Sequence, residues 1–159
     1  MRVGIGYDVH RLAPGRRLVL GGVEVASHQG LIGWSDADVL THAVIDALLG
    51  AAAMGDIGRH FPPGDPQYKD ISSLVLLQRV RDMLGEAGWR VGNIDATVVA
   101  EQPKLGSYID AMCQKLGQAL NIATGSVSVK ASTSEQLGFA GREEGMVAWA
   151  VATINKEKG

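Results

Sequence analysis

The sequence predicts an α+β protein in which three helices cover one face of a mixed sheet and a β-hairpin stands near the N-terminus. Two glycines, Gly21 and Gly22, separate two apolar runs, and strand-like and helix-like segments alternate after them. The final run, residues 146–154, is apolar at nearly every position. Because a half-exposed strand alternates polar and apolar residues, this strand needs cover on both faces. Helices would cover one face, and we expect a neighbouring subunit to cover the other.

The elements are predicted from periodicity and from turn and cap residues. Gly21-Gly22 is a strong hairpin signal, Ser35-x-x-Asp38 resembles a capping box, and Gly55 is a typical helix stop. The predicted order is strand 1–10, hairpin 16–26, loop 27–38, helix 39–55, loop 56–70, helix 72–88, strand 89–102, helix 104–121, strand 126–133, loop 134–145 and strand 146–154.

Length and composition indicate one domain over residues 1–159 and exclude several partner classes. A net charge of −2 argues against a nucleic-acid partner. The chain lacks an apolar run near the ~20 residues of a membrane span and lacks a secretory pattern, so we expect no membrane contact and a cytoplasmic location. Cys113 is the sole cysteine, so we expect a buried, reduced thiol in the third helix.

The opening strand ends in polar residues that strands usually avoid. Asp8 and His10 are two residues apart, so on a strand both side chains point to one face. His42 lies on the first helix, with Asp38 and Asp46 one turn away on the same face. Two imidazoles and one carboxylate suit a catalytic Zn²⁺, and they equally suit the triad of non-haem iron oxygenases. The plain alternative is a hydrogen-bonded Asp–His pair that fixes the end of the strand.

A second polar cluster occupies residues 130–142. Ser132, Thr133 and Ser134 follow a strand, and a glycine-rich loop comes after them. Small hydroxyls and exposed backbone N–H groups suit a phosphate, although the Walker order of residues is absent. Glu135 is placed to hold a hard cation such as Mg²⁺ or Mn²⁺ against phosphate oxygens. The alternative is a Ser/Thr-rich turn that caps a short helix.

Five segments appear together in a specific order: "GYDVH", "GLIGWSDADVLTHAVIDALLGAAAMGDIG", "FPPGDP", "EQPKL" and "KASTSEQLGFAGREEG". In this combination the chain resembles the 2-C-methyl-D-erythritol 2,4-cyclodiphosphate synthases of the non-mevalonate isoprenoid pathway. The likeness runs over nearly the whole chain. It implies a divalent-metal-dependent phosphorus–oxygen lyase that closes 4-diphosphocytidyl-2-C-methyl-D-erythritol 2-phosphate to the cyclic diphosphate and releases CMP. The 2-phosphate would attack the β-phosphorus, so no side-chain nucleophile is needed.

The resemblance also implies an assembly and its ligands. The family forms homotrimers with active sites between adjacent subunits, which agrees with the need of the last strand for cover on both faces. Some members hold an isoprenoid diphosphate on the threefold axis, and Arg142 and Glu144 would lie near the mouth of that cavity.

Site residues carry over where this sequence matches the family pattern. Asp8, His10 and His42 would bind Zn²⁺, with a substrate phosphate oxygen completing the set, and Glu135 would hold a second divalent ion bridging the substrate phosphates. Thr133 matches a residue that stabilises the transition state. Substrate contacts would come from Asp8, Val9, His10, Trp34, Ser35, Asp56, Ile57, Gly58, Phe61, Pro62, Pro63, Gly64, Asp65, Ala100, Pro103, Lys104, Leu105, Gly106, Ser132, Thr133, Ser134, Glu135, Phe139 and Arg142.

Two positions depart from the family pattern. Trp34 stands where the family usually has a catalytic His, and Pro63 stands where an acid is common, although Asp65 is present. An indole has one donor, no acceptor and no charge, so we expect slow but real cyclisation. His28 and His60 are the candidates to take over the missing imidazole role.

Two other functions compete with the synthase. A non-haem iron oxygenase would use the same triad, but such enzymes usually have all-β folds, whereas this sequence predicts three long helices. A trimeric zinc protein could instead bind nucleotides or isoprenoid diphosphates without chemistry. Oxygen-dependent turnover would identify the first alternative, and conversion of the diphosphocytidyl substrate to CMP would exclude the second.

Overall fold

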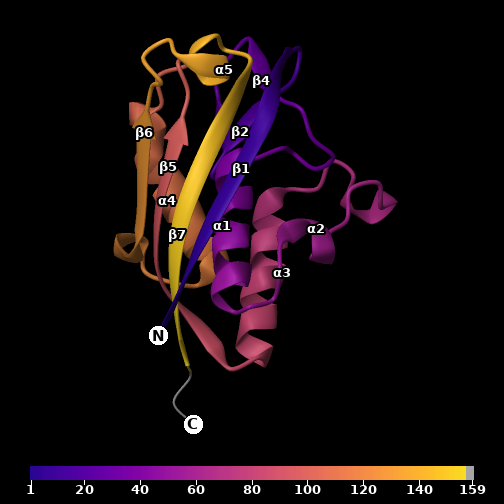
Figure 1. Cartoon of the computed structure of the whole chain (residues 1–159), viewed down its shortest axis with the longest axis vertical. Helices are drawn as coiled ribbons and strands as arrows, with labels where there is room; N and C mark the ends of the chain where they lie inside the picture. The colour runs from indigo at the N-terminus through magenta and orange to yellow at the C-terminus, as the bar shows by residue number, and fades with distance from the viewer. Residues whose placement is uncertain (157–159) are drawn as a thin grey trace.

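A five-stranded mixed sheet forms the centre of the computed structural model, which describes residues 1–156 (Figure 1). Its strands, in spatial order, are β4 (Gln29–Leu31), β1 (Arg2–Pro14), β7 (Gly145–Lys156), β5 (Trp89–Val99) and β6 (Val127–Ser132). The pair β5–β6 is parallel, and the other three pairs are antiparallel. The predicted mixed sheet is therefore confirmed.

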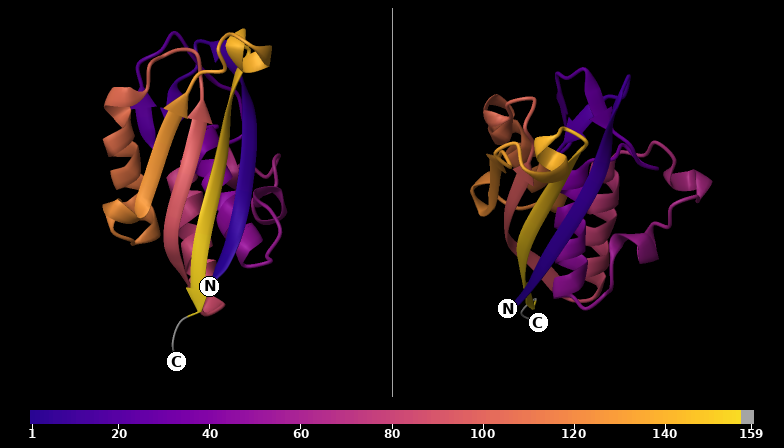
Figure 2. Two further views of the ribbon diagram at one scale, coloured as in Figure 1. Left: turned by 60° about the vertical axis from the view of Figure 1, so that its left-hand side comes forward. Right: turned by 45° about the horizontal axis from the view of Figure 1, so that its top comes forward.

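Three long helices lie on one face of this sheet, as predicted: α1 (Val39–Ala51), α3 (Ser73–Glu86) and α4 (Ile109–Leu120) (Figure 2). Helix α1 packs closely on β1 because β1 carries glycines there. A Cβ at Gly6 would collide with the carbonyl oxygen of Ala43, and one at Gly4 would collide with that of Ala47. This close approach brings the start of α1 next to the polar end of β1.

The predicted hairpin is confirmed as β2 (Leu18–Leu20) and β3 (Val23–Val25). Gly21 and Gly22 both have positive φ, 57° and 72°, which a two-residue hairpin turn of this kind requires. Their backbone N–H groups donate to the two carboxylate oxygens of Asp38, at 2.9 and 2.7 Å. Asp38, which is fully buried, thus ties the hairpin to the start of α1.

Helix α1 begins at residue 39 as predicted, but it ends at Ala51, before the predicted stop at Gly55, and its cap differs from the prediction. Asp38 is the N-cap of α1 and accepts from Thr41 N at 3.0 Å, so the cap is not Ser35. The third helix begins at Ile109 rather than at residue 104, because a short 3₁₀ turn, η2 (Gly106–Tyr108), precedes it. Cys113 on this helix is buried, as expected.

The predicted loops contain short elements. The first holds β4, and the 56–70 segment holds the one-turn helix α2 (Ile57–His60) and the 3₁₀ turn η1 (Pro66–Tyr68). Asp56 caps α2 by accepting from Arg59 N, and Asp65 caps η1 by accepting from Gln67 N. Two more short elements are η3 (Thr124–Ser126) and α5 (Gly138–Gly141).

The two faces of the sheet differ in cover. On the face away from the helices, the single chain leaves large apolar side chains exposed, among them Val3, Ile5 and Tyr7 of β1 and Trp149 and Val151 of β7. Alternate β7 residues, such as Ala148 and Ala150, are buried against the helices. Among residues 1–156, no helix is both long and apolar enough to span a membrane.

Candidate functional site

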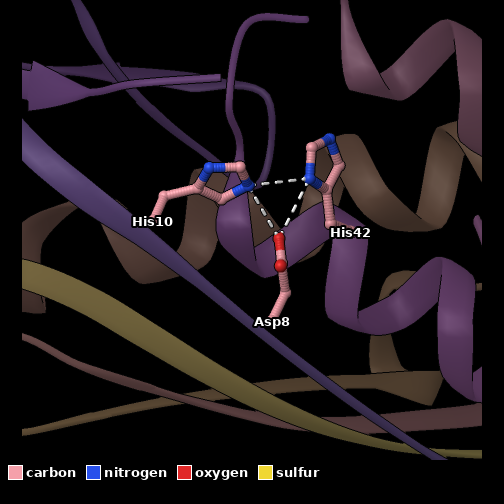
Figure 3. A group of neighbouring side chains, drawn as sticks. All are labelled: Asp8, His10 and His42. Atoms are coloured by element: carbon pink, nitrogen blue, oxygen red, sulfur yellow. Dashed lines mark hydrogen bonds and ion pairs between the residues drawn. The ribbon is translucent and has the colours of Figure 1, made fainter. Parts of the chain in front are cut away.

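Asp8 and His10 of β1 converge with His42 of α1, as the sequence predicts (Figure 3). Asp8 Oδ2 lies 2.9 Å from His10 Nε2 and 3.0 Å from His42 Nδ1. The two ring nitrogens are 3.2 Å apart. Asp8 and His10 are half-buried and His42 is buried, so three potential ligand atoms meet at one partly shielded point.

The outward nitrogen of each ring has its own partner. His10 Nδ1 lies 2.7 Å from the carbonyl oxygen of Ile32, and because a carbonyl can only accept, this nitrogen carries a hydrogen. A neutral His10 therefore presents a lone pair at Nε2. His42 Nε2 faces the hydroxyls of Ser73, at 2.8 Å, and of Ser35, at 3.1 Å.

The donor set fits a metal ion. One carboxylate and two imidazoles, with a coordination position left open, are typical of catalytic zinc sites. Ligands at ~2.0–2.2 Å from a tetrahedral ion lie roughly 3.3 Å apart, and the observed separations of 2.9 to 3.2 Å need only a small expansion. When both rings are neutral and present lone pairs here, these three atoms are all acceptors, so either a proton or a metal cation has to lie between them.

The charges of the three groups are coupled. Burial raises the pKa of Asp8, but hydrogen bonds and charge from His10 and His42 outweigh it and lower that pKa to about 2. Burial lowers the pKa of His10, whereas its hydrogen bond to Asp8 and the charge of that carboxylate raise it by more, so the net shift is upward. The Asp8 carboxylate thus stays ionised, and its negative charge favours a cation at the position between the three side chains.

A cavity of about 210 Å³ opens beside the triad. Its other walls are Trp34, Ser35, Ile57, Gly58, Phe61, Pro63, Tyr68 and Leu76. Most of these come from the loops before α1 and between α1 and α3, so one chain joins the triad to the predicted 56–58 and 61–65 substrate segments. A larger hollow of about 550 Å³, lined in part by Gln102 and Pro103, does not include the triad.

Trp34 forms part of the wall of the triad cavity and is fixed there by two hydrogen bonds. Its indole Nε1 donates to the carbonyl oxygen of Asp65 at 2.8 Å, and its own carbonyl accepts from Asp70 N at 2.9 Å. The single indole hydrogen is therefore already engaged. His60 Nε2 bonds the Met54 carbonyl oxygen, and neither His60 nor His28 lines this cavity.

Asp38 and Asp46, the two acids one turn from His42, are not part of the triad. Asp38 turns to the hairpin and to the start of the helix, as described above. Asp46 Oδ1 accepts from Ile57 N at 2.7 Å, and its pKa is raised, chiefly by burial. Asp46 therefore positions the 56–58 segment rather than a metal.

The second polar cluster is organised by a residue whose role the sequence did not reveal. Glu101 Oε1 accepts from Ser134 N, Ser134 Oγ and Gln136 N, at 2.9, 3.2 and 3.1 Å. Glu135 and Gln136 both have positive φ, 53° and 62°, so this carboxylate holds a turn that side chains disfavour. Thr133 Oγ1 donates to Glu135 Oε1 at 3.1 Å.

Thr133 and Glu135 do not line the triad cavity of their own chain, nor do the predicted contacts at 100–106 and 139–142. Arg142 pairs with Glu144 at 2.8 Å. The structure thus separates the predicted site residues into two groups, one around the triad and one on the loops after β5 and β6. Ser73, Asp36 and Asp46 support the first group, and only tertiary contacts reveal this. The sequence offered two signals for this support: Asp36 lies within the quoted segment GLIGWSDADV, and Asp46 lies one turn from His42.

Comparison with known proteins gives a consistent result. The model of the YgbB family matches residues 1–155. The 2-C-methyl-D-erythritol 2,4-cyclodiphosphate synthase of Dehalococcoides mccartyi strain CBDB1 is 64% identical over 157 residues, covering 99% of this chain and 100% of the relative. The synthase of Syntrophomonas wolfei is 62% identical over 156 residues, covering 98% of this chain and 99% of the relative.

Solved structures agree in fold. The bifunctional IspDF of Campylobacter jejuni superposes with a TM-score of 0.94 at 39% identity over 98% of this chain, which spans only 42% of that longer protein. The CDP complex of Plasmodium falciparum IspF superposes with a TM-score of 0.86 at 29% identity, covering 99% of this chain and 97% of the other. The helices and mixed sheet described above are thus those of known enzymes.

Proposed function

This chain belongs to the YgbB family, whose curated relatives are 2-C-methyl-D-erythritol 2,4-cyclodiphosphate synthases, and from that premise we propose how its residues carry out the cyclisation. The enzyme acts in isoprenoid precursor biosynthesis. We propose that it converts 4-diphosphocytidyl-2-C-methyl-D-erythritol 2-phosphate to the cyclic diphosphate and CMP, in the cytoplasm. Family membership favours this reaction over an iron oxygenase and over a protein that only binds its ligand.

The observation that carries the proposal is the convergence of Asp8, His10 and His42 at 2.9 to 3.2 Å beside a cavity. We assign Zn²⁺ to these three side chains, because their donor set matches catalytic zinc sites. A zinc ion held there supplies positive charge that polarises phosphate oxygens. The ionised Asp8 and the two ring nitrogens would keep that charge at the open side of the site.

The substrate brings its own nucleophile. An oxygen of its 2-phosphate attacks the β-phosphorus, and the new P–O bond closes the ring. The bond from the β-phosphorus to the bridging oxygen breaks, and CMP leaves with that oxygen. Since the protein supplies no attacking group, its work is to bring the two phosphates into line and to keep water out.

The walls of the triad cavity suit that work. Ile57, Phe61 and Leu76 give it an apolar lining that would take the methylerythritol carbon chain and exclude water. We assign the 56–58 segment and the 61–65 segment to substrate contact. Two hydrogen bonds support this, since Asp46 fixes Ile57 and Trp34 fixes Asp65, so both segments are held before any ligand arrives.

We assign the rest of the site to an adjacent subunit. Glu135 would hold Mg²⁺ or Mn²⁺ against the substrate diphosphate, and Thr133 would stabilise the transferring phosphate. The 100–106 segment would take the cytidine, with Phe139 and Arg142 beside it. The absence of all these residues from the triad cavity of their own chain supports an active site made by two chains.

The outer face of the sheet is the surface we propose for a homotrimer. Its apolar side chains form a continuous patch over the paired strands β1 and β7, in which Tyr7 is 48% exposed and Trp149 is 42% exposed. In a single chain this patch is in contact with water, and in a trimer it would be covered. Neighbouring subunits that cover this patch would also bring the loops after β5 and β6 close to the next triad. An isoprenoid diphosphate on the threefold axis would have to compete with Glu144 for Arg142.

Phosphorus NMR of the diphosphocytidyl substrate with the enzyme, Zn²⁺ and Mg²⁺ tests the proposed reaction. We expect the substrate resonances to give way to a cyclic diphosphate and one CMP per product. Linear phosphate products would indicate hydrolysis instead of cyclisation, and unchanged resonances would indicate a protein that only binds its ligand. Either result would contradict the proposal.

Trp34→His is expected to raise kcat by about 10-fold without changing the zinc content. The only N–H hydrogen of the indole is donated to the carbonyl oxygen of Asp65, so Trp34 cannot donate to the transferring phosphate. An imidazole offers a donor, and a fully preorganised donor is worth ~10²–10³ in rate. Trp34→Phe is the matched control, because it also loses the bond to Asp65 but adds no donor. A His variant no faster than the Phe variant would show that this position does not act on the phosphate here.

A further inference from the structure

We infer that Asp36 and Ser73 act as a positioning pair that keeps the hydrogen of His42 on Nε2 and so leaves Nδ1 free to bind the metal. Neither residue lines the triad cavity. The inference rests on the zinc site proposed above. It adds a reason why His42 can bind the metal, namely that the ring is held in the tautomer whose Nδ1 carries a lone pair.

The pair is rigid and partly shielded from water. Ser73 is fully buried as the first residue of α3. Its hydroxyl donates to Asp36 Oδ1, and its backbone N–H donates to Asp36 Oδ2 at 2.9 Å. The Asp36 backbone N–H donates in turn to the Ile71 carbonyl oxygen at 3.0 Å. The carboxylate therefore fixes both the start of α3 and the direction of the Ser73 hydroxyl.

That direction decides which nitrogen of His42 carries the hydrogen. A serine hydroxyl has one hydrogen, and an ionised carboxylate can only accept, so the hydrogen of Ser73 points at Asp36. Only lone pairs of Ser73 Oγ then face His42 Nε2, at 2.8 Å. Nε2 must supply the hydrogen of this bond, and the neutral ring keeps its lone pair on Nδ1.

Without the pair, another tautomer is favoured. Asp8 Oδ2 lies 3.0 Å from His42 Nδ1 and would attract a hydrogen there through a charge-assisted bond. Ser35 Oγ, at 3.1 Å from Nε2, can donate as well as accept, so it accommodates both tautomers. A hydrogen on Nδ1 would occupy the position that the metal needs. The Asp36–Ser73 pair opposes this, much as partners of ligating histidines fix the ring tautomer in other metal sites.

Ser73→Ala tests the inference through two measurements that do not depend on turnover. ¹⁵N NMR of the metal-free protein reports the tautomer of His42, and competition with a chelator reports the zinc affinity. We expect the Nε2–H form in the unaltered chain, a shift toward Nδ1–H in the variant, and zinc affinity lower by roughly 10–100-fold. Ser72→Ala is the matched control, because Ser72 is exposed and makes no side-chain cap bond. It should change neither quantity.

A Ser73→Ala protein with unchanged tautomer and unchanged zinc affinity would overturn the inference. A variant with only a lower unfolding temperature would also overturn it, because that result describes a structural serine. If the alanine variant does not fold, Ser73→Cys keeps a small side chain at this position with a weaker acceptor and should shift both quantities in the same direction. Failure of the zinc site itself has a different signature, since His42→Ala would then bind zinc as tightly as the unaltered chain.

Discussion

Replacing His42 with alanine is expected to remove most of the bound zinc and to lower kcat/KM by about 10³-fold or more. The variant loses one of three protein ligands, and metal polarisation of a phosphoryl group is worth several kcal/mol, which corresponds to about three powers of ten in rate. We expect the fold to persist, because the core of α1 is formed by other residues, among them Leu40, Ile45 and Leu48, which are fully buried.

Elemental analysis of the purified variant measures the zinc content, and release of CMP measures the rate. Lys115→Ala is the control, because Lys115 is exposed on α4 and lies outside the triad cavity, so it should keep both its zinc and its rate. A His42→Ala protein that retains a full equivalent of zinc would remove His42 from the ligand set and with it the proposed site.

Much of the fold follows from local sequence signals. Gly21-Gly22 specifies a two-residue turn, and the structure has one there with positive φ at both residues. The cap of helix α1 was less predictable than its start, because Ser35 and Asp38 are both residue types that suit an N-cap. The choice depends on a long-range contact, namely the two hairpin N–H groups that Asp38 also accepts. The short elements in the loops are likewise set by side-chain caps such as that of Asp56.

The triad was predictable because it combines a strand period of two with one helix residue. Asp8 and His10 had to share a face, and only the partner His42 came from elsewhere in the sequence. The residues behind the triad were not predictable in the same way. Ser73 lies 31 positions from His42, and nothing in the local pattern distinguishes it from its exposed neighbour Ser72.

The structure also separates the predicted site residues in a way that the sequence could not reveal. Thr133 and Glu135 lie on a turn that Glu101 holds, and they are absent from the cavity of the triad. We therefore propose that His42 of one chain and Glu135 of its neighbour serve the same active site. Each single variant, His42→Ala or Glu135→Ala, should then be inactive in every site of its own trimer.

A mixed trimer of these two inactive chains tests that claim most directly. In a ring of three, any mixture of the two chains contains one interface where an intact triad meets an intact Glu135, so about one site in three is complete. The chains would be co-expressed with different tags and purified through both tags in turn, and CMP release would be measured. We expect about a third of the activity of the unaltered enzyme. Mixed trimers as inactive as either parent would contradict a site shared between subunits.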